Sequence, residues 1–349
     1  MDWQRLWYES EKQEPPQRPL RWALGAAEGV FGAAVQARGW LYERGLLRTQ
    51  KVAGVRVISV GNLNVGGTGK TPAVIFLARR LLARGLRVCV VSRGYGRTIR
   101  DERVFSASAV ADGTGPAASE VGDEPLLIAQ KCPGLTLWVG SGRRRLAERA
   151  RDESGAQVVL LDDGLQHRAL RRDLEIVAID ETAGIGNGHL LPRGPLREPV
   201  SALGRAQLLW VRAAEGEAVP VVLPPFGGPI VRVRYRPVGV RRSSGARMAL
   251  GDLKGVRAVA VSGIARPASF ERKLRALGVE LTCHHAFPDH HRFARGELEE
   301  IRSRALATGA AILTTEKDLI RLPAALDAWA LEMETEILSG EAALDAALV

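Results

Sequence analysis

Short apolar runs recur along the chain and alternate with longer segments that have the periodicity of helices. Six such runs cover residues 55–60, 87–92, 135–139, 157–161, 175–179 and 207–211. The segments between them that are typical of helices are residues 73–83, 125–130 and 143–153. Apolar strands that alternate with helices predict an α/β fold, in which helices cover both faces of a mostly parallel sheet. Such sheets bind ligands at the carboxyl ends of their strands.

The pattern changes after about residue 220. A proline-rich stretch and an alternating segment at 231–235 come first, and new apolar runs follow at 256–262 and 311–315. This change predicts a boundary between domains. The expected parts are an N-terminal domain of residues 1–225, an extended connector of residues 226–250 and a smaller C-terminal α/β domain of residues 251–349.

Residues 20–41 have the pattern of one helix, with an apolar side that includes Leu24 and Phe31. Trp22 and Trp40 lie near its two ends, as aromatic anchors do at a bilayer interface. A helix packed on the protein's own core would have the same pattern. The chain has no run of about 18 uncharged apolar residues, so the sequence predicts no transmembrane helix.

The chain is basic, with a formal net charge of +10. This excess favours an anionic partner, such as a phosphorylated substrate, an acidic membrane surface or a nucleic acid. A GC-rich genome, which enriches proteins in arginine, would give the same excess. Only 5% of the residues are aromatic and none is interleaved with a basic stripe, so we expect no nucleic-acid partner. The three scattered cysteines predict reduced thiols in a cytosolic setting.

A glycine-rich turn joins the run at 55–60 to the helical segment that follows it. From Asn64 to Thr71 it reads NVGGTGKT, with Asn64 in the place of the usual first glycine of a phosphate-binding loop. In such loops, backbone N–H groups hold a polyphosphate, the lysine neutralises the β- and γ-phosphates, and the threonine hydroxyl binds Mg²⁺. The expected nucleotide-binding residues are Asn64, Val65, Gly66, Gly67, Thr68, Gly69, Lys70 and Thr71. The sequence therefore predicts a P-loop NTPase-like fold that uses or transfers the terminal phosphate of a nucleotide.

Carboxylates follow one predicted strand and open one predicted helix. Asp162 and Asp163 come directly after the run at 157–161, where a carboxylate can hold Mg²⁺ directly or through water. A polar turn would contain the same pair. Asp123 stands at the start of a helical segment, where it could simply cap the helix. It could also accept the proton of a hydroxyl that attacks a phosphoryl group.

Four of the six histidines fall within residues 284–291. A zinc site is one interpretation, but the spacing does not place two ligands on one helix face and no cysteines lie nearby. We favour a histidine that contacts a catalytic carboxylate across a cleft between the domains.

In chain order, these segments resemble one family, the tetraacyldisaccharide 4'-kinases, which phosphorylate the lipid A precursor of Gram-negative bacteria. The matching segments span about residues 20–320. They are GNLNVGGTGKTP (61–72), SRGYGR (92–97), GDEP (122–125), DDGLQH (162–167), LPRGPLREP (191–199), GIARP (263–267), FPDHH (287–291) and TTEKD (314–318). Two departures are Leu165, where the family usually has phenylalanine, and Phe270-Glu271, where a paired aromatic is common.

The resemblance implies an activity and a location. The activity is transfer of the ATP γ-phosphate, with Mg²⁺, to the 4'-hydroxyl of an acylated glucosamine disaccharide 1-phosphate. The location is the cytoplasmic face of the inner membrane, which the helix at about residues 18–43 would engage as a peripheral or monotopic element.

The resemblance also implies roles for individual residues. Asp123 would be the base that accepts the hydroxyl proton, and His290 its partner from the second domain. Lys70 and Arg143 would stabilise charge on the transferred group, while Arg93 and Arg197 would contact phosphates of the substrate or nucleotide. The metal ligands would be Thr71, Asp162, Asp163 and, with less support from the motif, Glu198.

Two other functional classes share some of these features. A nucleotide-dependent switch of the MinD type also has a loop of this kind and often a membrane-binding helix, but Val65 stands where that class has its signature lysine. A soluble sugar or nucleoside kinase would leave the N-terminal helix with its two tryptophans unexplained.

Overall fold

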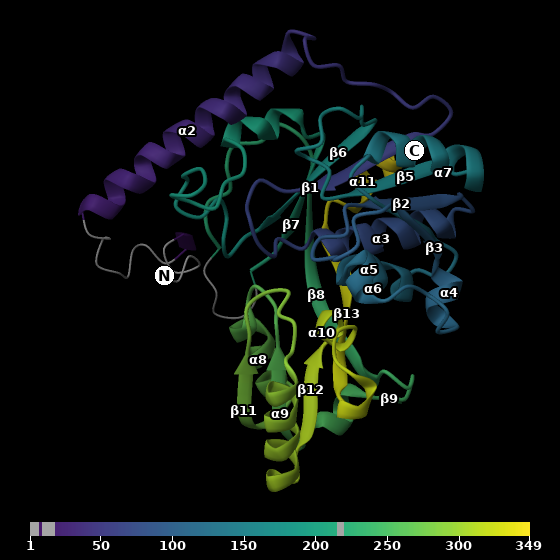
Figure 1. Ribbon diagram of the computed structural model, residues 1–349, viewed down its shortest axis with the longest axis vertical. Helices are drawn as coiled ribbons and strands as arrows, with labels where there is room; N and C mark the ends of the chain where they lie inside the picture. The colour runs from purple at the N-terminus through teal and green to yellow at the C-terminus, as the bar shows by residue number, and fades with distance from the viewer. Residues whose placement is uncertain (1–6, 9–17, 215–219) are drawn as a thin grey trace. The chain divides into compact units, whose positions relative to one another are not determined.

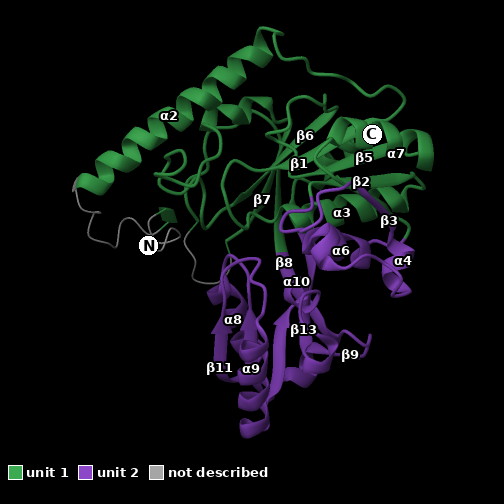
Figure 2. Cartoon of the chain, in the orientation of Figure 1, with its two compact units in different colours: residues 1–93, 134–234, 337–349 green, residues 94–133, 235–336 purple. Residues whose placement is uncertain are grey.

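The computed structural model of the protein describes residues 7–8, 18–214 and 220–349 (Figure 1). Residues 1–6, 9–17 and 215–219 of the expected N-terminal domain lie outside the described residues. The chain divides into two compact units, which Figure 2 shows in different colours. Unit 1 consists of residues 1–93, 134–234 and 337–349, and unit 2 of residues 94–133 and 235–336. The units therefore differ from the three consecutive parts expected from the sequence.

Unit 1 contains a parallel sheet with the strand order β8-β7-β6-β1-β5-β2-β4. Its central strands are buried along nearly their whole length, which explains their continuous apolar sequence. All six apolar runs of the first part of the chain lie in this sheet, so the prediction of a mostly parallel α/β fold is confirmed. The strands are β1 (Arg56–Gly61), β2 (Val88–Ser92), β4 (Thr136–Val139), β5 (Val158–Asp162), β6 (Leu174–Asp180), β7 (Leu208–Arg212) and the first part of β8 (Ile230–Arg242).

The register of this sheet brings two candidate segments to one edge. Val60 near the end of β1 pairs with Asp162 at the end of β5. The loop after β1 and the carboxylates after β5 therefore start side by side. The helices of unit 1 are α2 (Arg18–Glu43), α3 (Lys70–Ala83), α7 (Arg143–Ser154), the 3-10 helix η2 (Val200–Arg205) and α11 (Glu341–Leu348).

Unit 2 has the strand order β11-β10-β12-β13-β8, with parallel pairing from β11 to β13. Its strands are β10 (Arg257–Ser262), β11 (Glu280–Ala286), β12 (Ala311–Thr315) and β13 (Trp329–Ser339), besides the shared β8. Alternate residues of β10 point to opposite faces. Ala258 and Ala260 share a core with Phe270 of α8 (Pro267–Ala276), whereas Val259 and Val261 share another core with α9 (Arg295–Thr308). Strands β8 and β13 continue from one unit into the other, so the expected connector contains a strand that belongs to both.

The other elements of unit 2 come from two separate parts of the chain. The segment 94–133 contributes β3 (Arg103–Ser106), α4 (Ala107–Ala111), α5 (Ala118–Val121) and α6 (Asp123–Lys131). The later segment contributes β9 (Arg247–Met248), η3 (Leu250–Leu253), β10 (Arg257–Ser262), α8 (Pro267–Ala276), β11 (Glu280–Ala286), α9 (Arg295–Thr308), β12 (Ala311–Thr315), α10 (Glu316–Leu319), η4 (Ala324–Leu326) and β13 (Trp329–Ser339). A buried ion pair between Lys131 and Glu316 joins the two parts.

The expected N-terminal helix is present as α2, and it has two apolar sides. Leu24 is buried, and Phe31 and Val35 are half-buried on the side that packs on unit 1. On the other side Trp22, Val30 and Trp40 are 80%, 74% and 50% exposed. A rotation of about 100° per residue places these three with the exposed alanines at 26, 33 and 37 in one stripe. Among the described residues, no helix is both long and apolar enough to span a bilayer.

Glu28 fixes α2 to the body of unit 1. Its carboxylate accepts a hydrogen bond from the Leu190 backbone N–H at 3.0 Å. The same carboxylate lies 3.0 Å from Nδ1 of His189 and 3.3 Å from the Arg193 guanidinium. Glu28 therefore anchors the packed side of α2 to unit 1. The side that carries the two tryptophans takes no part in this contact.

Candidate active site

The glycine-rich loop runs from the end of β1 to the first residue of α3, Lys70. Gly61 must be glycine, because a Cβ there would lie 2.5 Å from the Cβ of Leu165. Gly69 caps α3 with a φ of 87°, a conformation that glycine adopts without steric cost. The loop therefore ends on a helix N-terminus whose N–H groups can face an anion.

Asn62, which the sequence analysis did not select, holds this loop in shape. Its side chain is fully buried and donates hydrogen bonds to the Asn64 carbonyl and to Oγ1 of Thr68, both at 2.8 Å. Its Oδ1 accepts hydrogen bonds from Lys70 at 3.1 Å and from Arg197. The Asn62 side chain thus connects two positions of the loop, Asn64 and Thr68, with Lys70, the lysine expected to contact the phosphates.

Asp163 is surrounded by three cations. Arg197 donates two hydrogen bonds to its carboxylate, at 2.9 and 2.8 Å, and Lys70 lies 3.7 Å away. Arg143, the first residue of α7, donates to the Asp163 carbonyl at 2.6 Å. Burial alone would raise the pKa of Asp163, but Lys70, Arg197 and Arg143 together lower it far below its usual value. This part of the site therefore has more positive than negative charge, as a site for polyphosphate requires.

The expected metal ligands lie in the same unit but do not form a closed cluster. Asp162 is buried at the end of β5 and accepts a hydrogen bond from Ser92 at 3.0 Å, and Glu198 pairs with Arg205 at 2.7 Å. Among the described residues, no three histidine, cysteine, aspartate or glutamate side chains are grouped to hold a metal. Mg²⁺ usually takes only one or two carboxylates and completes its shell with water and substrate phosphates, so the residues present fit it.

Asp123 and His290 are in contact, although 167 positions separate them along the chain. Nδ1 of His290 lies 3.1 Å from each oxygen of the Asp123 carboxylate, which is 4% exposed. Both residues belong to unit 2, because segment 94–133 packs there, so the expectation that the contact crosses between two domains was wrong. The interpretation of Asp123 as the cap of the helix was also wrong, because Asp123 is the first residue of α6 and Gly122 is its N-cap.

Two further cations stand close to Asp123. Arg321 Nε lies 3.6 Å from the Asp123 carboxylate, and Lys317 Nζ lies 4.0 Å from it. Burial would raise the pKa of Asp123, but the hydrogen bond with His290 and the charges of Lys317 and Arg321 lower it below its usual value. Asp123 is therefore an ionised carboxylate at neutral pH.

Two other histidines of the cluster, His284 and His291, have separate partners. His284 lies 2.8 Å from the Ser262 hydroxyl and 3.0 Å from Glu271, and His291 lies 2.8 Å from Glu297. This arrangement gives the zinc interpretation no support within the described ranges.

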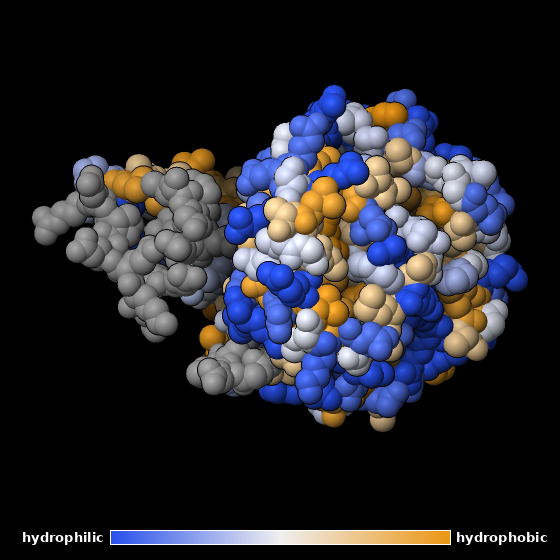
Figure 3. All heavy atoms as spheres, turned by 90° about the horizontal axis from the view of Figure 1, so that it is seen from below, coloured by the Kyte–Doolittle hydropathy of each residue, from blue (hydrophilic) through white to orange (hydrophobic). Residues whose placement is uncertain are grey.

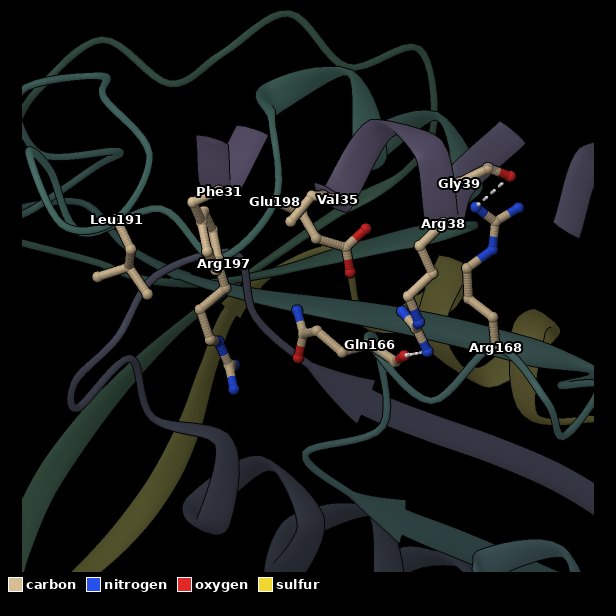
Figure 4. A pocket seen from close by; sticks show the side chains of 9 residues that line it. All are labelled: Phe31, Val35, Arg38, Gly39, Gln166, Arg168, Leu191, Arg197 and Glu198. Atoms are coloured by element: carbon tan, nitrogen blue, oxygen red, sulfur yellow. Dashed lines mark hydrogen bonds between the residues drawn. The ribbon is translucent and has the colours of Figure 1, made fainter. Parts of the chain in front are cut away.

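A cavity of about 350 Å³ lies in unit 1 beside α2 (Figure 4). Its wall combines apolar side chains with arginines, and Arg38 of α2 donates a 2.9 Å hydrogen bond to the Gln166 carbonyl. The lining residues are Phe31, Val35, Arg38, Gly39, Gln166, Arg168, Leu191, Arg197 and Glu198. Such a lining suits an amphiphilic ligand with an anionic group.

Comparisons with known proteins agree with these features. The model of the family described as Tetraacyldisaccharide-1-P 4'-kinase matches residues 20–349. The chain belongs to this family. A tetraacyldisaccharide 4'-kinase from Anaeromyxobacter dehalogenans (strain 2CP-C) is 47% identical over 343 residues, which cover 92% of this chain and 88% of that protein. One from Syntrophus aciditrophicus (strain SB) is 39% identical over 338 residues, with 91% and 88% covered.

A solved structure of the tetraacyldisaccharide 4'-kinase family is also similar. It is the crystal structure of the "apo" form LpxK from Aquifex aeolicus in complex with ATP, with a TM-score of 0.78 and 31% sequence identity. The match covers 94% of this chain and 98% of that one. Tetraacyldisaccharide 4'-kinases are kinases of lipid A biosynthesis, so the expected family and enzyme class are confirmed.

For a tetraacyldisaccharide 4'-kinase, the candidate residues divide into two groups. Unit 1 brings the loop and Lys70 together with Arg143, Arg197 and the two aspartates after β5, while Arg93 is exposed near Arg143. Unit 2 brings Asp123 and His290 together. The sequence analysis missed Asn62, Lys317 and Arg321, although Asn62 and Lys317 lie inside segments that it quoted.

Proposed function

We propose that this chain transfers the γ-phosphate of ATP to the 4'-hydroxyl of an acylated glucosamine disaccharide 1-phosphate. The observation that carries the proposal is the loop of residues 61–71, with Lys70 held at its end by Asn62 and Asp163. The ATP bound in the Aquifex aeolicus relative supports ATP as the donor. Phosphoryl transfer requires mainly alignment of the reactants and compensation of their charge, and a loop of this kind supplies both.

In this proposal Lys70 and Arg143 stabilise the charge that spreads over the transferred group. Arg93 and Arg197 contact phosphates of the nucleotide or the lipid. Asp123, ionised and buried, accepts the proton of the 4'-hydroxyl, and His290 orients it by a hydrogen bond.

Mg²⁺ would be held by the Thr71 hydroxyl and by carboxylates at the strand ends. Asp162 is the favoured carboxylate, because Asp163 is already engaged by Arg197 and Lys70. The buried Oε1 of Glu198 makes no hydrogen bond within the described part of the chain, so Glu198 is a further candidate. The bound ion would neutralise phosphate charge.

We assign the acceptor lipid to the cavity beside α2. Phe31, Val35 and Leu191 supply apolar contacts for acyl chains, whereas Arg38 and Arg197 supply donors for an anionic headgroup. This assignment gives α2 a second role in addition to packing.

We also propose that α2 lies at the cytoplasmic surface of the inner membrane as a peripheral or monotopic helix. Its outer stripe exposes two tryptophans and a valine, which is the pattern of a helix that inserts partway into the headgroup region. On the face that Figure 3 shows, by contrast, hydrophilic and hydrophobic residues are interspersed.

The decisive experiment is mass spectrometry of lipid products. The full chain is incubated with Mg²⁺, ATP and detergent-solubilised tetraacyldisaccharide 1-phosphate. The expected product carries one additional phosphate at the 4' position. If ATP is hydrolysed and the lipid stays unchanged, the chain is better described as a nucleotide-dependent switch.

Removing the outer stripe of α2 should weaken membrane binding while the fold is kept. In the triple variant Trp22→Ser, Val30→Ser and Trp40→Ser, we expect the partition onto anionic vesicles to fall by at least about 10-fold. Fully burying one such side chain contributes roughly 1.5–3 kcal/mol. Three partly inserted side chains together therefore contribute more than the free energy that corresponds to an about 10-fold change in partition. Flotation with phosphatidylglycerol-containing vesicles measures the effect.

The matched control is Leu306→Ser, which removes an exposed apolar side chain from α9. It should leave flotation unchanged. Equal flotation of the triple variant and the native chain would refute the assignment of α2 to the membrane surface.

A further inference from the structure

Residues 163–173 form the β5–β6 loop, which is described along its whole length and contains no helix or strand of its own. It nevertheless carries side chains of the candidate site. Asp163 lies 3.7 Å from Lys70, and Gln166 donates a hydrogen bond from Nε2 to the Asn62 carbonyl at 3.1 Å. The shape of the β5–β6 loop therefore decides where these two side chains stand beside the glycine-rich loop.

Arg172 supplies hydrogen-bond donors to the backbone of the β5–β6 loop. Carbonyl groups outside helices and strands need such donors from elsewhere. The Arg172 guanidinium donates to the carbonyl groups of His167 and Leu170, each at 3.1 Å, and of Leu165 at 3.4 Å. Its side chain is only 10% exposed. Because a guanidinium is a planar fork with five N–H groups, one side chain can hold three positions of the loop at once.

Glu175 of β6 holds this guanidinium in place. It is buried, and its Oε2 accepts a hydrogen bond from Nε of Arg172 at 2.6 Å. Its own backbone N–H donates to Oε1 of Gln207 at 2.7 Å. Burial raises the pKa of Glu175, and the charge of Arg172 opposes this rise. The pair therefore fastens the β5–β6 loop to a central strand of the sheet.

The start of the β5–β6 loop has a backbone that depends on such support. Asp163 has a φ of 56°, a sparsely populated conformation for a residue with a side chain. Gly164 follows it directly over β1, where a Cβ would clash with the Ser59 hydroxyl. Conformations of this kind persist only where the surrounding structure holds them. The contacts of Arg172 with the rest of the loop are part of that structure.

We propose that Arg172 is a positioning residue for phosphoryl transfer, which fixes the β5–β6 loop so that Asp163 and Gln166 stay beside the glycine-rich loop. The proposal rests on the function proposed above. Without the guanidinium, three carbonyl groups lose a donor and the loop relaxes to satisfy them. Phosphoryl transfer depends on alignment of the reactants more steeply than nucleotide binding does, so the loss falls mainly on turnover.

Two variants separate positioning from stability. Arg172→Met leaves the Glu175 carboxyl group buried without its partner, so Tm should fall. Arg172→Met combined with Glu175→Met removes both polar groups, and Tm should return most of the way to the native value. In both variants kcat should be about 10- to 100-fold below native, the range for loss of a residue that orients site ligands, with KM for ATP within about threefold. Rates are measured well below the lowest Tm.

A double variant with native Tm and native kcat would show that the pair serves the fold alone, and the proposal would be wrong. Arg172→Lys keeps a cation beside Glu175, but one ammonium group cannot reach all three carbonyl groups, so kcat should stay at least about 10-fold below native. Native kcat in Arg172→Lys, or loss of its fold, would also overturn the proposal. The control is Arg149→Met with Glu153→Met, which removes an exposed ion pair of α7 and should keep native Tm and kcat.

Hydrogen exchange of the full chain without nucleotide tests the loop directly. In the double methionine variant, the hydrogen-bonded amides of the β5–β6 loop, such as those of Gly164 and His167, should exchange at least about 10-fold faster than in the native chain. Amides of β5 and β6 should be unchanged. Unchanged exchange in the loop would contradict the proposal. If the native chain does not phosphorylate the lipid, the proposed function fails, and exchange still decides whether Arg172 holds the loop.

Discussion

Replacement of Asp123 by asparagine should lower kcat for lipid phosphorylation by about 10³-fold, within the range for loss of a general base. The amide has nearly the same shape as the carboxylate but cannot accept the hydroxyl proton. Lys70 and the glycine-rich loop belong to unit 1, so KM for ATP should stay within about threefold of the native value. Initial rates with varied ATP at saturating lipid separate the two parameters.

The control for this variant is Asp101→Asn, at an exposed aspartate of the same unit, which should keep native turnover. Asp123→Ala should lose as much activity as Asp123→Asn. Near-native kcat in the asparagine variant would remove Asp123 from the role of base. A parallel rise in KM for ATP would instead indicate a part in nucleotide binding.

Replacement of Lys70 by alanine should abolish measurable transfer, with a loss of at least about 10³-fold in kcat/KM. Lys70 supplies a positive charge at the end of the loop, where its Nζ lies 3.1 Å from Oδ1 of Asn62 and 3.7 Å from the Asp163 carboxylate. Loss of the lysine also leaves the negative charge of Asp163 with one fewer cation beside it. In contrast to the Asp123 variant, both ATP affinity and turnover should fall, which calorimetry with a non-hydrolysable ATP analogue and initial rates can show.

Lys51→Ala is the matched control, since Lys51 forms a more exposed ion pair with Asp173 in the same unit. It should change neither affinity nor turnover. If Lys70→Ala binds the analogue normally and keeps its turnover, the loop does not hold the triphosphate, and the proposed function loses its main support.

The sequence predicted the local features of this molecule well. The strands were predicted within a few residues, because buried parallel strands such as β1 and β5 are apolar along their whole length. The loop from Asn64 to Thr71 was recognisable, because its glycines and its Lys-Thr pair are fixed in spacing.

Features that depend on distant packing could not be predicted in the same way. The place of segment 94–133 in unit 2 depends on contacts such as the Lys131–Glu316 ion pair, which leave no periodic signal. In the sequence, Lys317 looks like an ordinary surface lysine. Only the fold shows that its Nζ lies 2.9 Å from Nε2 of His290. Asn62 was overlooked because a single amide beside a glycine-rich motif reads as part of the turn.

The helix α2 was predicted with one apolar side and has two. Small alanines at 26, 33 and 37 carry little hydrophobic signal, so the outer stripe is weak in the sequence although Trp22 and Trp40 mark its ends. The structure separates the sides because Leu24 is buried while both tryptophans are exposed.

Because α2 has an apolar side on the cavity and an apolar side exposed outward, it bears on how a water-insoluble lipid can reach the site. An α-helix with its side chains is about 10–12 Å thick, so a single helix would separate the bilayer from the cavity. A fatty acyl tail is longer than this thickness. In the proposed arrangement, an acyl tail can therefore reach around α2 from the bilayer to the apolar wall of the cavity, so that the lipid is phosphorylated without leaving the membrane surface. Glu28 fastens α2 to the loop around His189 and Arg193, so we expect the helix to keep this place between the bilayer and the cavity.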